Sequence, residues 1–122
     1  MKEEIEINGV TYVPKGSEVT KKVQTKKGLE YCIVRTYSAG VFAGYFNRKT
    51  KGQEGTVFNV RRLWRWEGSA SLSQFAKEGT SKPNDCKFPC EVDEIDLKQI
   101  IEVIPCTEKA KKTIDSVPVW SE

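Results

Sequence analysis

The sequence predicts an α+β domain, with a mainly antiparallel β-sheet and two short α-helices in the C-terminal half. Three observations support this class. Runs rich in β-branched and aromatic residues alternate with short turns in the first half of the chain. Two later segments carry residues that start and end helices. Most strands precede the helices, which is typical of α+β proteins rather than of regularly alternating α/β proteins.

The first predicted element is an N-terminal β-hairpin. Its turn is Asn8-Gly9, a strong two-residue hairpin signal because both turn positions need a positive φ. A polar, lysine-rich connector follows over residues 15–28. We therefore expect a single domain over residues 1–122, with the hairpin and connector in residues 1–29 and a ligand-binding core in residues 30–122.

The core is predicted to begin with a second hairpin, formed by residues 30–37 and 41–46. A long strand over residues 56–66 comes next. Strict alternation divides this strand into two faces. The first face carries Phe58, Val60, Arg62, Trp64 and Trp66, and the second carries Val57, Asn59, Arg61, Leu63 and Arg65.

The first helix is predicted to start at Ser71, which forms a capping box with Gln74, and to end at Gly79. Residues 88–92 are predicted to form a short strand and residues 99–105 a stronger one. The last helix is predicted to start after Thr107 and to end before Pro118.

Composition restricts the function. No apolar run is long enough to cross a membrane, and the acidic N-terminus lacks the features of a secretory signal, so a cytoplasmic protein is expected. A net charge of +3 with local basic patches suits a small anionic ligand better than a long nucleic acid. The absence of histidine removes the commonest general base and favours a protein that is not an enzyme.

The four cysteines are predicted to be reduced. Cys32 and Cys106 lie in apolar, strand-like segments and are expected in the core. The alternative is a zinc site in which these two join Cys86 and Cys90, but the spacing is loose. We therefore expect neither a metal nor a cofactor.

Two segments are candidates for ligand binding. In residues 61–74, arginines and tryptophans precede a helix start, a combination that suits the phosphates and base of an adenine nucleotide. In the alternative interpretation, the tryptophans are core, the serines only cap the helix and the arginines face solvent. The second segment is RTYSAG, where Arg35 and Tyr37 share a face before a tight turn.

Two other functions remain open. Asp85 and the Asp96-Leu97-Lys98 step resemble the carboxylate and lysine set of a metal-dependent nuclease. The lysine-rich segments are compatible with a nucleic-acid-binding accessory protein, whose affinity would fall steeply with salt.

Three long segments bear a closer resemblance. They are YCIVRTYSAGVFAGYF, NVRRLWRWEGSASLSQFAKEG and IIEVIPCTEKAKKTI. They resemble a family of tailed-phage proteins that block the bacterial Thoeris antiviral system, and the likeness runs from about residue 31 to the C-terminus. Members of that family act as sponges that sequester the cyclic ADP-ribose signal made by the host TIR enzyme.

The resemblance implies a symmetric homodimer or higher oligomer in the cytoplasm of the infected bacterium, which holds glycocyclic ADP-ribose without degrading it. It also implies that cyclic oligonucleotides can bind. Phe75 would stack on the ligand, Asn84 would make a polar contact, and Lys109 would close the site. The ligand-binding residues that it implies are Arg35, Tyr37, Arg62, Trp64, Ser71, Gln74, Phe75, Asn84 and Lys109. The role of Phe75 requires its ring to be accessible.

Overall fold

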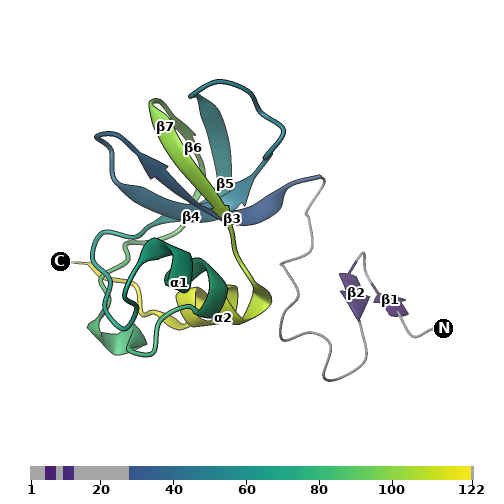
Figure 1. Cartoon of the computed structure of the whole chain (residues 1–122). Helices are drawn as coiled ribbons and strands as arrows, with labels where there is room; N and C mark the ends of the chain where they lie inside the picture. The colour runs from purple at the N-terminus through teal and green to yellow at the C-terminus, as the bar shows by residue number, and fades with distance from the viewer. Residues whose placement is uncertain (1–4, 8–9, 13–27, 122) are drawn as a thin grey trace.

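The computed structural model describes residues 5–7, 10–12 and 28–121 (Figure 1). It confirms the α+β class, with a five-stranded antiparallel sheet and both α-helices in the C-terminal half. Residues 15–27 of the lysine-rich connector lie outside the described residues. The elements are β1 (Ile5–Ile7), β2 (Val10–Tyr12), β3 (Glu30–Thr36), β4 (Val41–Phe46), β5 (Gly55–Arg62), α1 (Leu72–Glu78), the 3₁₀ turn η2 (Pro83–Asp85), β6 (Val92–Leu97), β7 (Ile100–Pro105) and α2 (Glu108–Ser116).

Both predicted hairpins are confirmed. Strands β1 and β2 pair antiparallel, with Ile5 opposite Tyr12. Strands β3 and β4 also pair antiparallel along nearly their whole length.

The five-stranded sheet curls toward a barrel. Its strand order is β6-β5-β4-β3-β7, so β6 and β7 form opposite edges. Only Lys98 and Gln99 separate these two strands in the sequence, which forces the edges to approach one another at that turn. The main-chain carbonyl of Gln99 accepts a hydrogen bond from Tyr37 N at 2.9 Å, which ties the turn to the end of β3.

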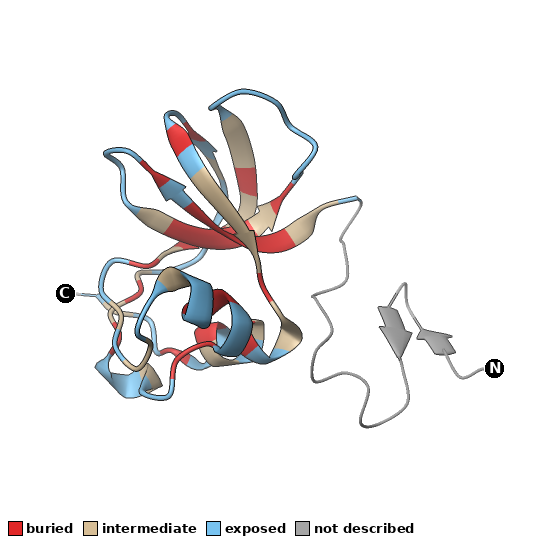
Figure 2. Cartoon of the chain, in the orientation of Figure 1, coloured by how far each residue is buried: buried red, intermediate tan, exposed pale blue. Residues whose placement is uncertain are grey.

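Each face of the sheet packs a separate hydrophobic cluster. The concave face holds side chains from all five strands: Cys32, Val34, Phe42, Phe46, Val57, Val60, Leu97 and Ile100. The opposite face packs on the two helices, which lie together on one side of the sheet (Figure 1). Figure 2 shows buried residues in the strands of the sheet, and further ones in the helices and the loops beside them.

The predicted alternation along residues 56–66 is wrong beyond Val57. A β-bulge at Asn59, where φ is 47°, inserts one residue and shifts the register between β4 and β5. Val57 and Val60 therefore both enter the concave cluster. Gly44 makes room for the bulge, because a Cβ there would lie 2.8 Å from the carbonyl oxygen of Phe58. The strand ends at Arg62, earlier than predicted.

Both predicted helices are confirmed, together with their caps. Ser71 and Thr107 accept hydrogen bonds from the main chain of the first turn, and Gly79 ends α1 with a φ of 78°. The predicted strand over residues 88–92 is wrong, because the strand in this region is β6, which starts at Val92. The acidic residues of β6 do not resemble a typical strand sequence, so the strand was not predicted there. They lie at an exposed edge of the sheet, where charge discourages pairing with another chain.

Candidate functional site

An open groove lies where the chain leaves β5 and runs beside the segment after η2. Its volume is about 420 Å³, and it is lined by Arg65, Glu67, Asn84, Asp85, Cys86 and Lys87. Two main-chain hydrogen bonds hold its walls together, from Arg65 N to Lys87 O at 3.2 Å and from Lys87 N to Arg65 O at 2.8 Å. The volume falls within the range of small-molecule sites.

A stacked pair of tryptophans borders this groove. The rings of Trp64 and Trp120 are parallel within 3°, and their centroids lie 4.8 Å apart. Lys87 connects the pair to the groove, because its Nζ lies 5.9 Å from the Trp64 ring centroid and 5.6 Å from that of Trp120. Trp64 remains 56% exposed, so an aromatic surface lies open beside a cation.

Arg61 holds the segment that carries Trp120. The bulge at Asn59 moves this side chain from the concave face, which Val57 enters, to the helix-facing side of the sheet, where it is only 6% exposed. Its guanidinium donates hydrogen bonds to five carbonyl oxygens, those of Phe88, Pro89, Ile114, Val117 and Pro118. Burial lowers the pKa of Arg61, although nearby groups such as Tyr31 and Asp115 raise it. The cation therefore fastens the end of α2 to β5, a position that also suits the helix dipole.

The groove contains donors and acceptors of both signs. Arg65 and Lys87 can donate to phosphate oxygens. Glu67 and Asp85 can accept from hydroxyl groups, as carboxylates do when they bind a ribose. This combination suits a nucleotide better than a bare polyanion.

The structure brings only two of the predicted ligand-binding residues near this site. Asn84 lines the groove, and Trp64 contacts Lys87 at its border. Lys109 lies on an exposed part of α2 and is not among the groove residues.

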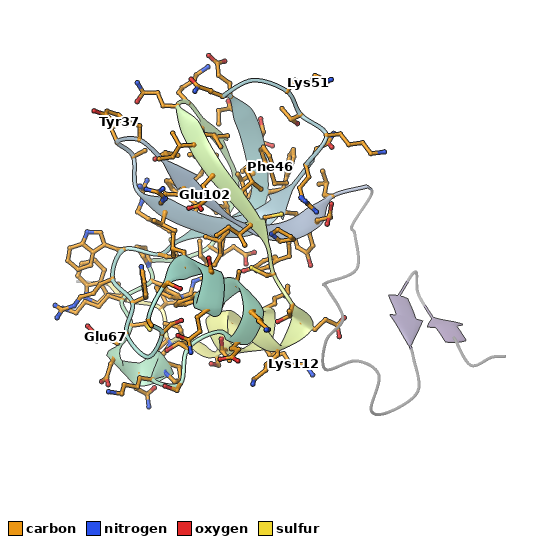
Figure 3. All side chains as sticks on the ribbon, in the orientation of Figure 1. Tyr37, Phe46, Lys51, Glu67, Glu102 and Lys112 are labelled. Atoms are coloured by element: carbon orange, nitrogen blue, oxygen red, sulfur yellow. The ribbon has the colours of Figure 1, made fainter. Side chains whose placement is uncertain are left out.

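Three other predicted residues gather around the turn between β3 and β4. Arg35 pairs with Glu102 on β7 at 2.9 Å. Arg62 donates to the carbonyl of Ala39 at 2.6 Å and lies over the Phe42 ring. Tyr37 is 77% exposed at the tip of this turn, well separated from the groove residue Glu67 in Figure 3.

The assignment of Phe75 to a ligand-stacking role is wrong for this structure. Its ring is fully buried, packed edge-on against Trp66 at 5.5 Å and near Phe88 at 6.3 Å. The apolar face of α1 turns this ring toward the sheet, so no ligand can reach it without opening the core.

The predicted phosphate site at the start of α1 is already occupied by the protein's own side chains. Ser71 Oγ accepts from Gln74 N at 3.2 Å, and Gln74 Oε1 accepts from Ala70 N at 2.7 Å. These contacts satisfy main-chain donors that a phosphate would otherwise use. The alternative role, in which these residues only cap the helix, matches this geometry.

Sequence reasoning missed Lys87 and Trp120 as members of the site. The one signal in the sequence was a large aromatic residue after the helix stop at Pro118, outside any predicted element. Nothing local pairs residue 120 with residue 64, because their contact depends on how the chain returns to β5.

The residues of the alternative nuclease site are divided between two grooves. Asp85 lines the groove described above. Asp96 and Lys98 line a smaller groove of about 190 Å³, where Asp96 accepts from Thr56 Oγ1 at 2.6 Å and Lys98 pairs with Glu54 at 3.1 Å.

The cysteines are also dispersed. Cys32 lies in the concave cluster and Cys106 in the helix-facing cluster, and both are fully buried, as predicted for core residues. Within the described ranges, no group of three or more cysteine, aspartate or glutamate side chains could hold a metal ion.

Fold and groove together define a small α+β domain with an open, polar groove that a stacked pair of tryptophans borders. The chain belongs to the family described as a domain of unknown function (DUF6948), whose model matches residues 29–114. This range contains Trp64 and the whole groove but stops before Trp120. No curated protein and no solved structure matches the chain. None of the described helices is long and apolar enough to span a bilayer.

Proposed function

We propose that this protein is a phage anti-defence sponge. It binds the TIR-derived cyclic ADP-ribose signal of the bacterial Thoeris system, glycocyclic ADP-ribose, and sequesters it without degrading it. It works in the cytoplasm of the infected host as a homodimer or a higher symmetric oligomer.

The observation that carries this proposal is the groove beside Trp64. Its volume of about 420 Å³ is suited to a nucleotide, and Arg65 and Lys87 supply cations for a diphosphate. The exposed Trp64 ring supplies a stacking surface for a base. The resemblance of residues 31–46, 59–79 and 100–114 to the sponge family supplies the identity of the ligand.

Capture without turnover agrees with the composition. The chain contains no histidine, so it has no imidazole for acid–base catalysis. A sponge removes signal in proportion to its own concentration, so tight binding and slow release replace catalytic rate.

The test is a calorimetric titration of purified protein with cyclic ADP-ribose isomers, followed by heat denaturation and recovery of the ligand. We expect tight binding of at least one isomer and release of an unchanged ligand. Absence of binding, or recovery of a modified product, contradicts the proposal.

Two variants locate the binding. Lys87→Glu reverses the charge at the groove and should weaken binding by at least about tenfold, as expected for the loss of a charge-assisted phosphate contact. Lys98→Glu makes the same charge change in the separate, smaller groove and should leave the affinity unchanged. Equal effects of the two substitutions would point to general electrostatics instead of a site.

A further inference from the structure

We infer that Trp64 and Trp120 form an aromatic clamp that opens to admit a purine base between the two rings. This inference rests on the proposed function and names the part of the site that takes the base. It assigns a ligand contact to Trp120, which lies outside both the family match and the ligand-binding residues predicted from the sequence.

The two tryptophans stack directly on one another in this structure. Their rings are parallel and stacked at the border of the groove, with 4.8 Å between centroids. A base between them requires the rings to separate by roughly one further aromatic thickness, about 3.5 Å. One tryptophan–tryptophan stacking contact would then be replaced by two tryptophan–base stacking contacts. The stacking energy gained from the base therefore exceeds the stacking energy lost when the rings separate.

Trp64 forms the fixed side of the clamp. Trp64 lies between two anchored residues, since Leu63 N donates to Val41 O at 2.8 Å and Arg65 pairs with Lys87 through the main chain. The main chain that carries its ring therefore has a defined position at the groove.

Trp120 forms the other side of the clamp, and its segment makes fewer main-chain contacts. Trp120 N donates to Phe88 O at 3.0 Å, and Val119 forms an isolated bridge with Phe88. Arg61 fixes the chain more firmly two positions earlier, through the carbonyls of Val117 and Pro118. Residues 119 and 120 can thus move about this anchor without disturbing α2, at the cost of their main-chain contacts with Phe88.

The charges around the clamp fit the rest of a nucleotide. Lys87 Nζ lies within 6 Å of both ring centroids and also lines the groove, so it can meet a phosphate attached to a base held by the rings. Arg65 lies opposite Lys87 across the bridged segments. Glu67 and Asp85 also line the groove, where ribose hydroxyls can donate to them.

The experiment measures affinity and intrinsic tryptophan fluorescence with three probes: glycocyclic ADP-ribose, ADP-ribose and ADP. The variants are Trp64→Leu and Trp120→Leu, with Val119→Ala as the matched control that alters the same segment and keeps both rings. We expect each tryptophan variant to lose about tenfold or more in affinity, and the control to bind as the unaltered protein does.

The affinities of the two leucine variants distinguish a clamp, in which both rings contact the base, from a cover, in which Trp120 moves away and only Trp64 contacts the base. If Trp64→Leu weakens binding while Trp120→Leu binds equally well or more tightly, Trp120 only covers Trp64 and the clamp is overturned. If neither variant weakens the binding of glycocyclic ADP-ribose, the clamp is overturned while the sponge function stands. If ADP or ADP-ribose binds through both tryptophans and glycocyclic ADP-ribose does not bind, the clamp stands and the proposed sponge ligand fails. Absence of binding to any probe overturns both.

Two further measurements distinguish the loss of a ligand contact from the misfolding of a variant. Trp64→Phe and Trp120→Phe keep an aromatic face and should recover part of the lost affinity. The unaltered protein should show tryptophan quenching when a probe binds, because the tryptophan–tryptophan stack is replaced by stacks on a base. Binding without any change in tryptophan emission contradicts the clamp, whatever the variants do.

Discussion

Arg61 shows how one side chain links the fold to the candidate site. It is a nearly buried cation whose partners are main-chain carbonyls of the segments before β6 and at the end of α2. A buried charge is tolerated only when its hydrogen-bonding capacity is used, and here all three guanidinium nitrogens donate. The residue that supports the Trp120 segment is thus an arginine that the sequence alone places equally well in solvent.

Arg61→Leu should lower the free energy of unfolding by about 3 kcal/mol, because five carbonyl oxygens lose their donor. Urea denaturation followed by circular dichroism measures the loss. Arg48→Leu is the matched control, since Arg48 makes only a partly exposed ion pair with Glu30 at 3.2 Å, and it should cost less than about 1 kcal/mol. Similar losses for both variants would show that Arg61 does not anchor the C-terminal segment.

At the scale of elements, the end of α1 is fixed by its contact with α2. Gly79 adopts φ 78° and ψ −157°, a conformation that is largely restricted to glycine. A Cβ on this residue would also collide with the side chain of Thr113 on α2. The same threonine accepts a hydrogen bond from Thr80 N at 3.1 Å, so the two helices meet at a position without spare volume.

Gly79→Ala should therefore cost about 3 kcal/mol of unfolding free energy, from backbone strain and overpacking together. Gly52→Ala is the control, because Gly52 also has a positive φ of 83° but a methyl group there would meet nothing within 4 Å, and it should cost about 1 kcal/mol. Thermal and urea unfolding measure both. Adding Thr113→Ala should recover part of the Gly79→Ala loss, and the absence of any recovery would contradict the steric explanation.

At the scale of the whole molecule, both hydrophobic clusters use the same five-stranded sheet, so the concave cluster and the helical layer depend on one another. Tyr31 and Cys106 lie in the helix-facing cluster, and both carry groups that ionise at alkaline pH. Burial raises the pKa of the Tyr31 phenol, and nearby Asp115 adds to this effect. Burial also raises the pKa of the Cys106 thiol, with a further contribution from Cys32.

These raised pKa values predict alkaline destabilisation. The unfolded chain loses the Cys106 proton above its usual pKa of 9.0 and the Tyr31 proton above 10.0, while the folded protein keeps both. Stability from each group is therefore complete below its unfolded pKa and declines above it, by about 1.4 kcal/mol per pH unit for each proton. Urea denaturation between pH 7 and 11 measures the decline. Between pH 9.0 and 10.0, Cys106→Ala should make the fall of the unfolding free energy with pH less steep, by the contribution of about one proton. An unchanged pH dependence would contradict the assignment of this effect to Cys106.

Much of the fold could be predicted because its signals are local. Asn8-Gly9 lies between paired strands, the Ser71 and Thr107 side chains cap their helices, and Gly79 ends α1. Each of these depends on residues within a few positions of one another. The prediction that residues 30–46 form β-strands follows in the same way from the side-chain shapes of consecutive residues.

The tertiary structure alone decided how these pieces form a site. The bulge at Asn59 changes which side chains of β5 share a face, and it places Arg61 as a buried anchor on the helix-facing side of the sheet. The burial of Phe75 and the contact between Trp64 and Trp120 likewise depend on segments distant in the sequence. Local propensity and alternation carry no information about such contacts, because the free energy that selects them comes from packing and hydrogen bonding across the folded chain.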